Sequence, residues 1–276
     1  MTKLENNYKN LIEKNLEKIL DKKVFYQDIL FEAAKYSLLS NGKRLRPLIV
    51  LNILNAFEKE IEIGLDSASA IEMVHSYSLI HDDLPAMDND DYRRGKLSLH
   101  KKYSEWVAIL TGDFLLTYSF EVLSDIKDLS DLKKIELIKI LSRSIGAEGM
   151  LAGQVVDILS ENKKTDEKKL LFMHENKTAK LFMASFEFGA VLSDADINTR
   201  KILKETGLNF GLYFQFMDDI NDEKISSSDI SKNKSTVLTV YGSEKANIMA
   251  KNYLKRANYL LDTLKKDFSK LKKLFI

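Results

Sequence analysis

The scarcity of residues that interrupt helices is the feature that most constrains how this chain can fold. Only two prolines and 11 glycines occur among 276 residues, below the usual shares of roughly 5% and 7%. Apolar residues also recur at helical intervals through most of the sequence, as they do on a helix with one buried face. We therefore predict an all-α fold, a bundle of about ten or more helices.

No segment rich in Pro, Gly and Ser divides the chain, and no fixed-period repeat is visible. We therefore expect a single domain over residues 1–276. The most apolar stretch, residues 106–123, has about the length of a short membrane span, but it contains Asp113 and Glu121, whose charges are costly in a bilayer. We interpret this stretch as a buried core helix and expect no membrane span.

The composition excludes several classes of function. Lys and Arg total 42 against 41 for Asp and Glu, so the net charge of +1 offers no basic field for nucleic acid. The chain has no Cys, which excludes thiolate catalysis and Cys-ligated zinc. The lack of Cys and of a secretory signal in the N-terminal segment favours a reducing, cytoplasmic location.

A first acidic cluster follows an apolar helical run. Asp82 and Asp83 come at its end, Pro85 is expected to stop or bend the helix, and Asp88 follows five residues after Asp83. His75 and Asp82 are predicted to lie about 20° apart on one helix face. Ionised carboxylates beside apolar surface are costly unless cations neutralise them, so the cluster indicates a metal site.

A second acidic cluster nearly repeats the spacing of the first, after the apolar run at residues 207–216. It contains Gln215, Asp218, Asp219 and Asp222. Carboxylate oxygens without Cys suit a hard cation such as Mg²⁺, which usually keeps coordination positions for substrate phosphates. One such cluster alone also fits a solvated helix end, but two clusters that each close an apolar helix favour a functional site.

Short cationic segments accompany the acidic clusters. Residues 41–47 place Lys43 and Arg46 where a loop enters a helix, and both helix N-termini and guanidinium groups favour phosphate oxygens. Arg93 and Arg94 follow the first acidic cluster directly, where they also fit local charge balance. Further candidates are Lys177 with Thr178, and Lys224, Lys232 and Lys234.

Taken together, these ordered motifs resemble the trans-isoprenyl diphosphate synthases, and most closely the bacterial farnesyl diphosphate synthases. The resemblance covers nearly the whole chain. Its motifs are the basic segment 41–47, the first Asp-rich motif, Arg93-Arg94-Gly95, Gly112-Asp113, Gly153-Gln154 with Asp157, Lys177-Thr178, and Gln215 with the second Asp-rich motif.

The resemblance implies an isoprenoid-synthase type bundle around a central active-site cavity, and it implies roles for individual residues. Three Mg²⁺ ions, with Mn²⁺ as a substitute, would join the allylic diphosphate to Asp82, Asp88, Asp218 and Asp222, supported by Asp83 and Asp219. The allylic diphosphate would be bound by Arg93, Lys177, Thr178, Gln215, Lys224 and Lys234. The diphosphate of isopentenyl diphosphate would be bound by Lys43, Arg46, His75 and Arg94. The implied catalytic set is Asp82, Asp83, Asp88, Arg93, Lys177, Asp218 and Asp219.

The implied reaction needs no nucleophilic side chain. An allylic carbon loses its diphosphate, the double bond of isopentenyl diphosphate attacks that carbon, and a proton leaves with the departing diphosphate. Metal ions and positioned cations neutralise the charge that develops on the leaving group. The resemblance also implies a homodimer.

In that family, bulk beneath the first Asp-rich motif sets the product length. Tyr77 and Ser78 lie five and four residues before Asp82, and an aromatic floor there implies the C15 product, farnesyl diphosphate. Tyr77 also fits a packed interior residue. Synthesis of geranyl or geranylgeranyl diphosphate is the main alternative, and a non-catalytic subunit of a heteromeric prenyl synthase is a second. Four phenylalanines fit either the walls of the cavity or the hydrophobic core: Phe182, Phe186, Phe214 and Phe216.

Overall fold

The computed structural model describes the backbone of residues 3–22, 25–225 and 235–275, and the side chains of these residues except 3–5 and 222–225. Over this range the chain consists of helices and loops with a single pair of short strands, β1 (Tyr92–Arg93) and β2 (Lys96–Leu97). The predicted all-α fold is confirmed. The chain divides into unit 1, residues 1–55 with 60–138, and unit 2, residues 56–59 with 139–276. The single domain remains a prediction.

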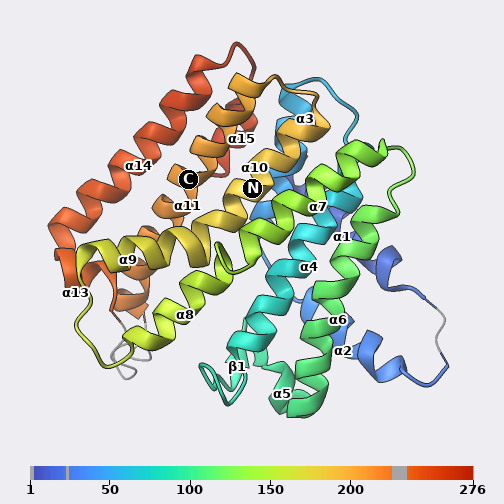
Figure 1. Cartoon of the computed structure of the whole chain (residues 1–276), viewed down its shortest axis with the longest axis horizontal. Helices are drawn as coiled ribbons and strands as arrows, with labels where there is room; N and C mark the ends of the chain where they lie inside the picture. The colour runs from blue at the N-terminus through green and yellow to red at the C-terminus, as the bar shows by residue number, and fades with distance from the viewer. Residues whose placement is uncertain (1–2, 23–24, 226–234, 276) are drawn as a thin grey trace. The chain divides into compact units, whose positions relative to one another are not determined.

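Unit 1 is organised by α4 (Leu65–Asp82), which packs against α6 (Glu105–Ser124), α1 and α2. Figure 1 shows α4 and α6 side by side. Buried residues lie on every side of α4, as expected of a helix surrounded by neighbours. The other elements of unit 1 are α1 (Lys3–Leu20), α2 (Asp28–Leu38), α3 (Leu45–Ala56), the 3₁₀ turn η1 (Glu62–Gly64) and α5 (Leu99–Lys102).

The apolar helix α6 has one buried face and one exposed face. Val107, Thr111 and Leu115 are buried, whereas Trp106 is 58% exposed and Leu110 is 50% exposed. Among the described residues, α6 is the one helix with the length and apolarity to cross a membrane, and 44% of its apolar window is buried. The predicted core helix is therefore buried on one face only, and the other face is apolar over its first two turns.

In unit 2 the longest helix, α11 (Ile197–Ile225), packs against α10 (Lys180–Leu192) and α14 (Ser243–Thr263). Phe182, Phe186 and Phe216 are fully buried and are therefore core residues, whereas Phe214 is partly exposed. The chain passes from unit 1 to unit 2 within α7 (Asp131–Ile145). The other elements of unit 2 are α8 (Met150–Ser160), α9 (Glu167–His174), the π-helical turn η2 (Glu175–Ala179), α13 (Val237–Tyr241) and α15 (Ser269–Lys273).

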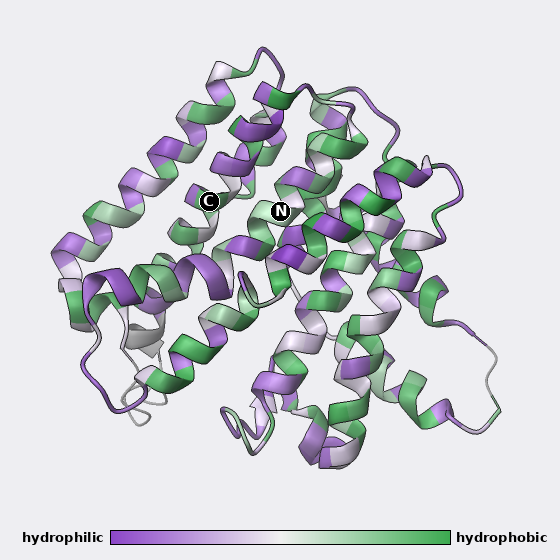
Figure 2. Ribbon diagram, in the orientation of Figure 1, coloured by the Kyte–Doolittle hydropathy of each residue, from purple (hydrophilic) through white to green (hydrophobic). Residues whose placement is uncertain are grey.

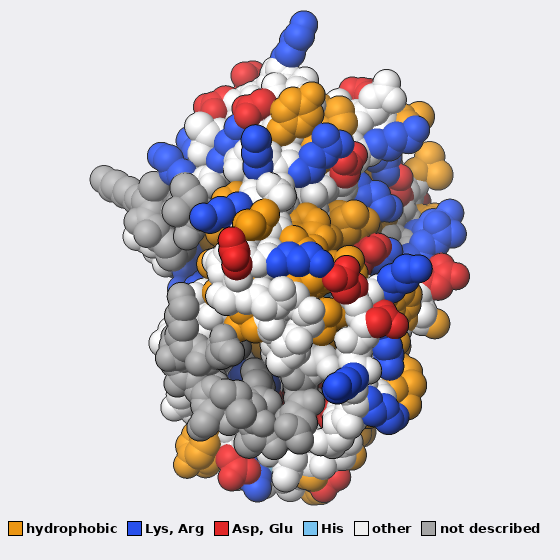
Figure 3. Space-filling view, turned by 90° about the vertical axis from the view of Figure 1, so that its left-hand side faces the viewer, with side chains coloured by type: hydrophobic (Ala, Val, Ile, Leu, Met, Phe, Trp, Pro, Cys, Tyr) orange, Lys and Arg blue, Asp and Glu red, His pale blue; other side chains and the backbone are white. Residues whose placement is uncertain are grey.

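The surface of unit 2 follows the amphipathic pattern of its helices. Figure 2 shows hydrophilic and hydrophobic residues alternating along α14, and its buried residues, among them Ala246, Ala250 and Ala257, form a stripe at helical spacing. On the face drawn in Figure 3, acidic and basic side chains are interspersed rather than separated.

Candidate active site

The first Asp-rich motif forms a compact turn at the end of α4. The helix ends at Asp82, and exposed Pro85 follows shortly after, as predicted. The backbone N–H of Asp88 donates to the carbonyl oxygen of Asp82 at 2.8 Å. The four residues between Asp83 and Asp88 therefore form a loop that returns Asp88 to the helix end. Asp82 and Asp88 are partly exposed, but the side chain of Asp83 is only 4% exposed.

Asp83 is paired with Arg93 from the strand β1. Arg93 Nε donates to Asp83 Oδ1 at 2.9 Å, and Arg93 Nη2 donates to the same oxygen. Arg93 Nη2 also lies 3.5 Å from Asp90 Oδ2. Burial opposes the charge of Arg93, but the carboxylates of Asp83, Asp90 and Asp82 raise its pKa above the usual value. Arg93 is therefore a fixed cation at the first acidic motif.

A tight hairpin directs the two neighbouring arginines to different partners. Arg93 pairs with Lys96 across the strands, and the turn residues Arg94 and Gly95 have φ values of 52° and 77°. Two positive φ angles are typical of the type I′ hairpin turn, and Gly adopts them without strain. While Arg93 reaches Asp83, Arg94 Nη1 donates to Ser40 Oγ at 3.4 Å. The hairpin therefore places one arginine at the acidic motif and the other at the basic segment 41–47.

The cations of unit 1 gather around His75. Burial lowers the pKa of His75 well below its usual value, and the positive charges of Arg46, Arg94, Arg44 and Arg93 lower it further. The imidazole is therefore neutral among several guanidinium groups. Such a group of side chains suits a multiply charged anion, because the guanidinium groups supply charge while the neutral ring supplies a hydrogen bond.

The basic segment itself is held by Arg44, for which no role was predicted. Arg44 is buried with a φ of 52°. Its Nη1 donates to Glu72 Oε1 and its Nη2 to the carbonyl oxygen of Ser40, each at 2.8 Å. Lys43 is exposed and Arg46 is partly exposed on either side of it. Arg44 therefore fixes the loop from which the two predicted diphosphate-binding cations project.

The two predicted chain-length residues lie between His75 and Asp82. Tyr77 is buried, with its ring edge-on to His81 at 5.8 Å between centroids. Burial and the nearby charge of Asp82 raise the pKa of Tyr77 to about 12. Ser78 Oγ donates to the carbonyl oxygen of His75 at 2.9 Å. Tyr77 is therefore a neutral, packed aromatic residue next to the acidic motif.

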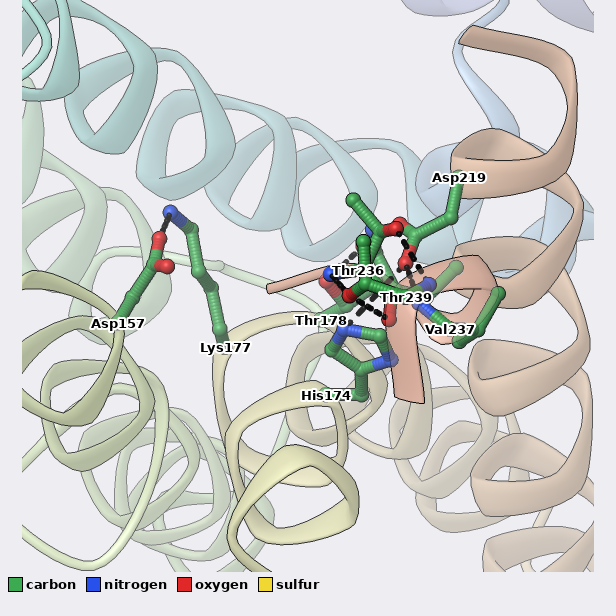
Figure 4. A network of polar contacts seen from close by, with 9 residues as sticks. Asp157, His174, Lys177, Thr178, Asp219, Thr236, Val237 and Thr239 are labelled. Carbon is green, nitrogen blue, oxygen red and sulfur yellow. Dashed lines mark hydrogen bonds and ion pairs between the residues drawn. The ribbon is translucent and has the colours of Figure 1, made fainter. Parts of the chain in front are cut away.

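In unit 2, Lys177 and Thr178 lie in the π-helical turn η2 between α9 and α10. Such turns are rare and are frequent at functional sites. Lys177 Nζ donates to Asp157 Oδ2 at 2.5 Å, a pair seen on the left of Figure 4. A Cβ on Gly153 would lie 2.2 Å from Lys177 N, so only Gly allows α8 to approach the turn this closely. No role was predicted for Asp157, although the resemblance includes it.

A chain of hydrogen bonds joins η2 to the second Asp-rich motif (Figure 4). The hydroxyl of Thr178 donates to Gln215 Oε1 at 2.6 Å, and Gln215 Nε2 donates to Asp219 Oδ1 at 2.7 Å. The other oxygen of Asp219 accepts from the backbone N–H of Val237 at 2.9 Å. Asp218, one residue earlier on α11, is exposed. The structure thus joins Thr178, Gln215 and Asp219 in one network.

His174 lies beside this network, and no role was predicted for it. It is buried, its ring is edge-on to Phe216, and its Nε2 lies 3.7 Å from Asp219 Oδ2. Burial lowers the pKa of His174 to about 4, although the charge of Asp157 opposes the shift. The residue is therefore a neutral packing partner. Its only sequence signal is its position at the end of α9, three residues before Lys177.

Several predicted ligands lie outside the described side chains, namely Asp222, Lys224, Lys232 and Lys234. Among the described residues there is no group of three or more His, Asp or Glu side chains placed to hold a metal ion. Mg²⁺, however, is usually held by one or two carboxylates together with water and substrate phosphates. In unit 1 the partly exposed Asp82 and Asp88, and in unit 2 the exposed Asp218, are each accessible to ligands of that kind.

Comparison with known proteins identifies the family. The model of the polyprenyl synthetase family matches residues 27–274. The farnesyl diphosphate synthase of Bacillus subtilis (strain 168) is 41% identical over 266 residues, 93% of this chain and 90% of that protein. A chloroplastic geranylgeranyl pyrophosphate synthase of Capsicum annuum is 37% identical over 260 residues, 90% of this chain and 70% of that protein.

A solved structure of a geranyltransferase from Helicobacter pylori, complexed with magnesium and isoprenyl diphosphate, has a TM-score of 0.84 and 35% identity. The match covers 99% of this chain and 95% of that one. The all-α fold and the resemblance drawn from the motifs are thereby confirmed, and the chain belongs to the polyprenyl synthetase family.

Proposed function

We propose that this chain is a short-chain prenyltransferase that condenses an allylic diphosphate, dimethylallyl or geranyl, with isopentenyl diphosphate, and that its main product is farnesyl diphosphate. The family match and the relatives named farnesyl diphosphate synthase support this reaction. One structural observation carries the proposal. The hairpin sends Arg93 to the acidic motif and Arg94 to the basic segment, as an enzyme with two diphosphate substrates requires.

The ionisation step breaks the bond between the allylic carbon and its diphosphate oxygen. Negative charge then develops on the leaving group, and Arg93 and Lys177 are cations already fixed by Asp83 and Asp157. Preorganised charges of this kind lower the barrier because they need no reorientation during the reaction. The hydroxyl of Thr178, held toward Gln215, adds a hydrogen-bonding group beside Lys177.

The condensation step forms a bond between the allylic carbon and the terminal carbon of isopentenyl diphosphate. Lys43, Arg46, His75 and Arg94 bind the diphosphate of this second substrate, with His75 neutral as its lowered pKa requires. One proton is lost, and the released diphosphate accepts it, so no side chain needs to act as the base. This accounts for the lack of a nucleophile in the motif set.

The proposed active site also requires divalent ions. The residues that would hold three Mg²⁺ ions are Asp82, Asp88, Asp218 and Asp222, and the ions would neutralise the charge of the leaving diphosphate. Mn²⁺ is expected to substitute, because it also prefers carboxylate oxygens. Lys224 and Lys234 are proposed as further ligands of the allylic diphosphate on the strength of the family resemblance alone.

Tyr77, with neighbouring Ser78, is proposed to limit the product to C15. Its ring is buried next to Asp82, where it would block further growth of the prenyl chain. We expect Tyr77→Ala to give longer products, whereas Tyr77→Phe keeps the ring and the C15 product. Chromatography of the prenyl alcohols after dephosphorylation distinguishes the two, and an unchanged length in Tyr77→Ala would contradict this role.

We also propose a homodimer that uses the exposed face of α6. Trp106, Ile109 and Leu110 form an apolar patch on that face, and such patches mark contact surfaces. Trp106→Glu should give a monomer in sedimentation experiments, whereas Ile248→Glu on exposed α14 should leave the oligomer intact. A cytoplasmic, single-domain enzyme without a nucleic-acid partner agrees with the composition.

The direct test is identification of the product. Purified chain is incubated with isopentenyl diphosphate and either dimethylallyl or geranyl diphosphate, and the dephosphorylated product is identified. Farnesol is the expected result. Geranylgeraniol would instead support the alternative suggested by the chloroplastic relative, and no turnover by the chain alone would support a non-catalytic subunit.

A further inference from the structure

We propose that the two members of each Asp–Asp pair have different roles, and that the second one, Asp83 or Asp219, is a positioning residue that fastens the segment following its motif. The first one, Asp82 or Asp218, would hold the Mg²⁺ ions of the proposed site, the role that the family resemblance already gives it. This inference rests on the proposed function for its effect on turnover, but the contacts that carry it belong to the protein alone.

The evidence at the first motif is the burial and the bonding of Asp83. Its side chain is 4% exposed, and two nitrogens of the Arg93 guanidinium donate to a single one of its oxygens. Arg93 lies ten residues later, in β1 directly before the hairpin turn. The pair therefore closes the loop between α4 and β1, and it fixes the direction of a cation that the allylic diphosphate needs.

The evidence at the second motif is of the same kind. The side chain of Asp219 is 9% exposed, and both of its oxygens accept hydrogen bonds from the protein. One donor is Gln215, which Thr178 orients. The other is the backbone N–H of Val237, the first residue of α13, 18 positions along the chain. Figure 4 shows Asp219 above Val237, with the His174 ring below both.

Helix geometry explains why one of two adjacent aspartates can face a ligand while the other positions the chain. Successive side chains on an α-helix point about 100° apart. Asp218 is exposed while Asp219 is turned inward, and Asp82 is partly exposed while Asp83 is buried. A buried carboxylate that already accepts hydrogen bonds is costly to detach, so the inward member of each pair is suited to hold the chain rather than an exchangeable ion.

Asp83 is tested with a double-mutant cycle on the affinity for inorganic pyrophosphate with Mg²⁺, measured by calorimetry. If Asp83 acts through Arg93, Asp83→Asn and Arg93→Gln should each weaken binding by about tenfold, and the double variant should be no weaker than Arg93→Gln alone. Asp83→Glu should retain the ion pair and most of the affinity. Asp91→Asn, on the exposed part of the same loop, is the matched control.

The proposal for Asp83 would be overturned if the affinity losses of the two single variants multiply in the double variant. That result would mean that Asp83 contacts the ligand or its ions independently of Arg93. Thermal unfolding of each variant identifies any that fail to fold; if Asp83→Asn does, Asp83→Glu still tests the pair, because a tenfold loss of affinity in this charge-conserving variant would overturn the proposal. Pyrophosphate binding needs no turnover, so a chain that binds normally but makes no prenyl product would contradict the proposed function and leave this inference intact.

Asp219 is tested by comparing amide and methyl replacements. Asp219→Asn can still accept from Val237 N–H and bond to a reoriented Gln215, so its kcat should exceed that of Asp219→Ala by about tenfold or more. Asp218→Asn and Asp218→Ala should be equally damaging, since an amide is a poor ligand for Mg²⁺.

Hydrogen exchange of the Val237 amide gives a readout without substrate. Its protection should fall in Asp219→Ala and persist in Asp219→Asn, while Thr236→Ala, which removes the cap of α13 but leaves Asp219 in place, reports the effect of helix fraying alone. Unchanged protection of Val237 in Asp219→Ala, or equal loss of kcat in Asp219→Asn and Asp219→Ala, would overturn the positioning role.

Discussion

Gly153→Ala tests how closely α8 must approach the turn that carries Lys177. The added Cβ would lie 2.2 Å from the backbone nitrogen of Lys177 and 2.7 Å from its Cα. Non-bonded heavy atoms prefer separations of about 3.5 Å or more, so the two segments must move apart by roughly 1 Å. Neither contact can be relieved by turning a side chain, because both atoms belong to the backbone.

The displacement should affect stability and activity together. Overpacking of this kind costs about 1–3 kcal/mol, which outweighs the gain of about 0.5–1 kcal/mol that Ala usually brings to a helix interior. A displacement near 1 Å at a group that positions substrate can reduce turnover by about 10²-fold. We therefore expect a lower melting temperature and a kcat reduced by one to two orders of magnitude.

Thermal unfolding and steady-state kinetics at saturating substrate measure the two effects. Val155→Ala, on the exposed side of the same helix, is the control and should change neither by much. A Gly153→Ala variant that is as active as wild type, or more stable than it, would show that η2 does not depend on this close approach.

Three further predictions concern buried charges and ionisation. Glu72→Gln leaves buried Arg44 with only its longer ion pair, to partly exposed Glu13 at 3.7 Å, and should destabilise the fold by about 3 kcal/mol in urea unfolding. His174 has a folded pKa of about 4, so stability should be complete above pH ~6.5 and fall by up to about 3 kcal/mol as pH decreases toward 4; His174→Gln should remove that part of the slope. Asp157→Asn should release Lys177 and lower kcat about tenfold in steady-state assays.

Local sequence signals were sufficient for the helices and for the ends of several of them. The scarcity of Pro and Gly indicated the all-α fold, and Pro85 marked the end of α4 at Asp82. These features depend on residues within one or two turns of each other. The clustering of cations around His75 was expected only through the family resemblance, which assigns Lys43, Arg46, His75 and Arg94 to one diphosphate.

Other features depend on partners distant in the sequence and could not be predicted. Arg44 sits between two predicted ligands in the same motif, yet it turns inward because Glu72, 28 positions later, is buried opposite it. The pairing of Lys177 with Asp157 depends on how closely α8 packs against a π-helical turn. Hydrophobic periodicity contains no information about either contact, since both involve polar side chains.

On the exposed face of α6, the burial predicted from composition also differs from the burial observed. Its apolar composition predicted burial, but burial also requires a neighbour, and within the described residues Trp106 and Leu110 have none that covers them. The composition therefore identified an apolar surface but not the partner that would cover it.

The central claim is that divalent ions at the acidic motifs allow diphosphate to leave an allylic carbon. The most direct measurement is the rate of prenyl product formation by the purified chain against free Mg²⁺ concentration, starting from protein treated with EDTA. We predict no product without divalent ions and full recovery when Mg²⁺ is added. Undiminished turnover in the presence of EDTA would contradict the account.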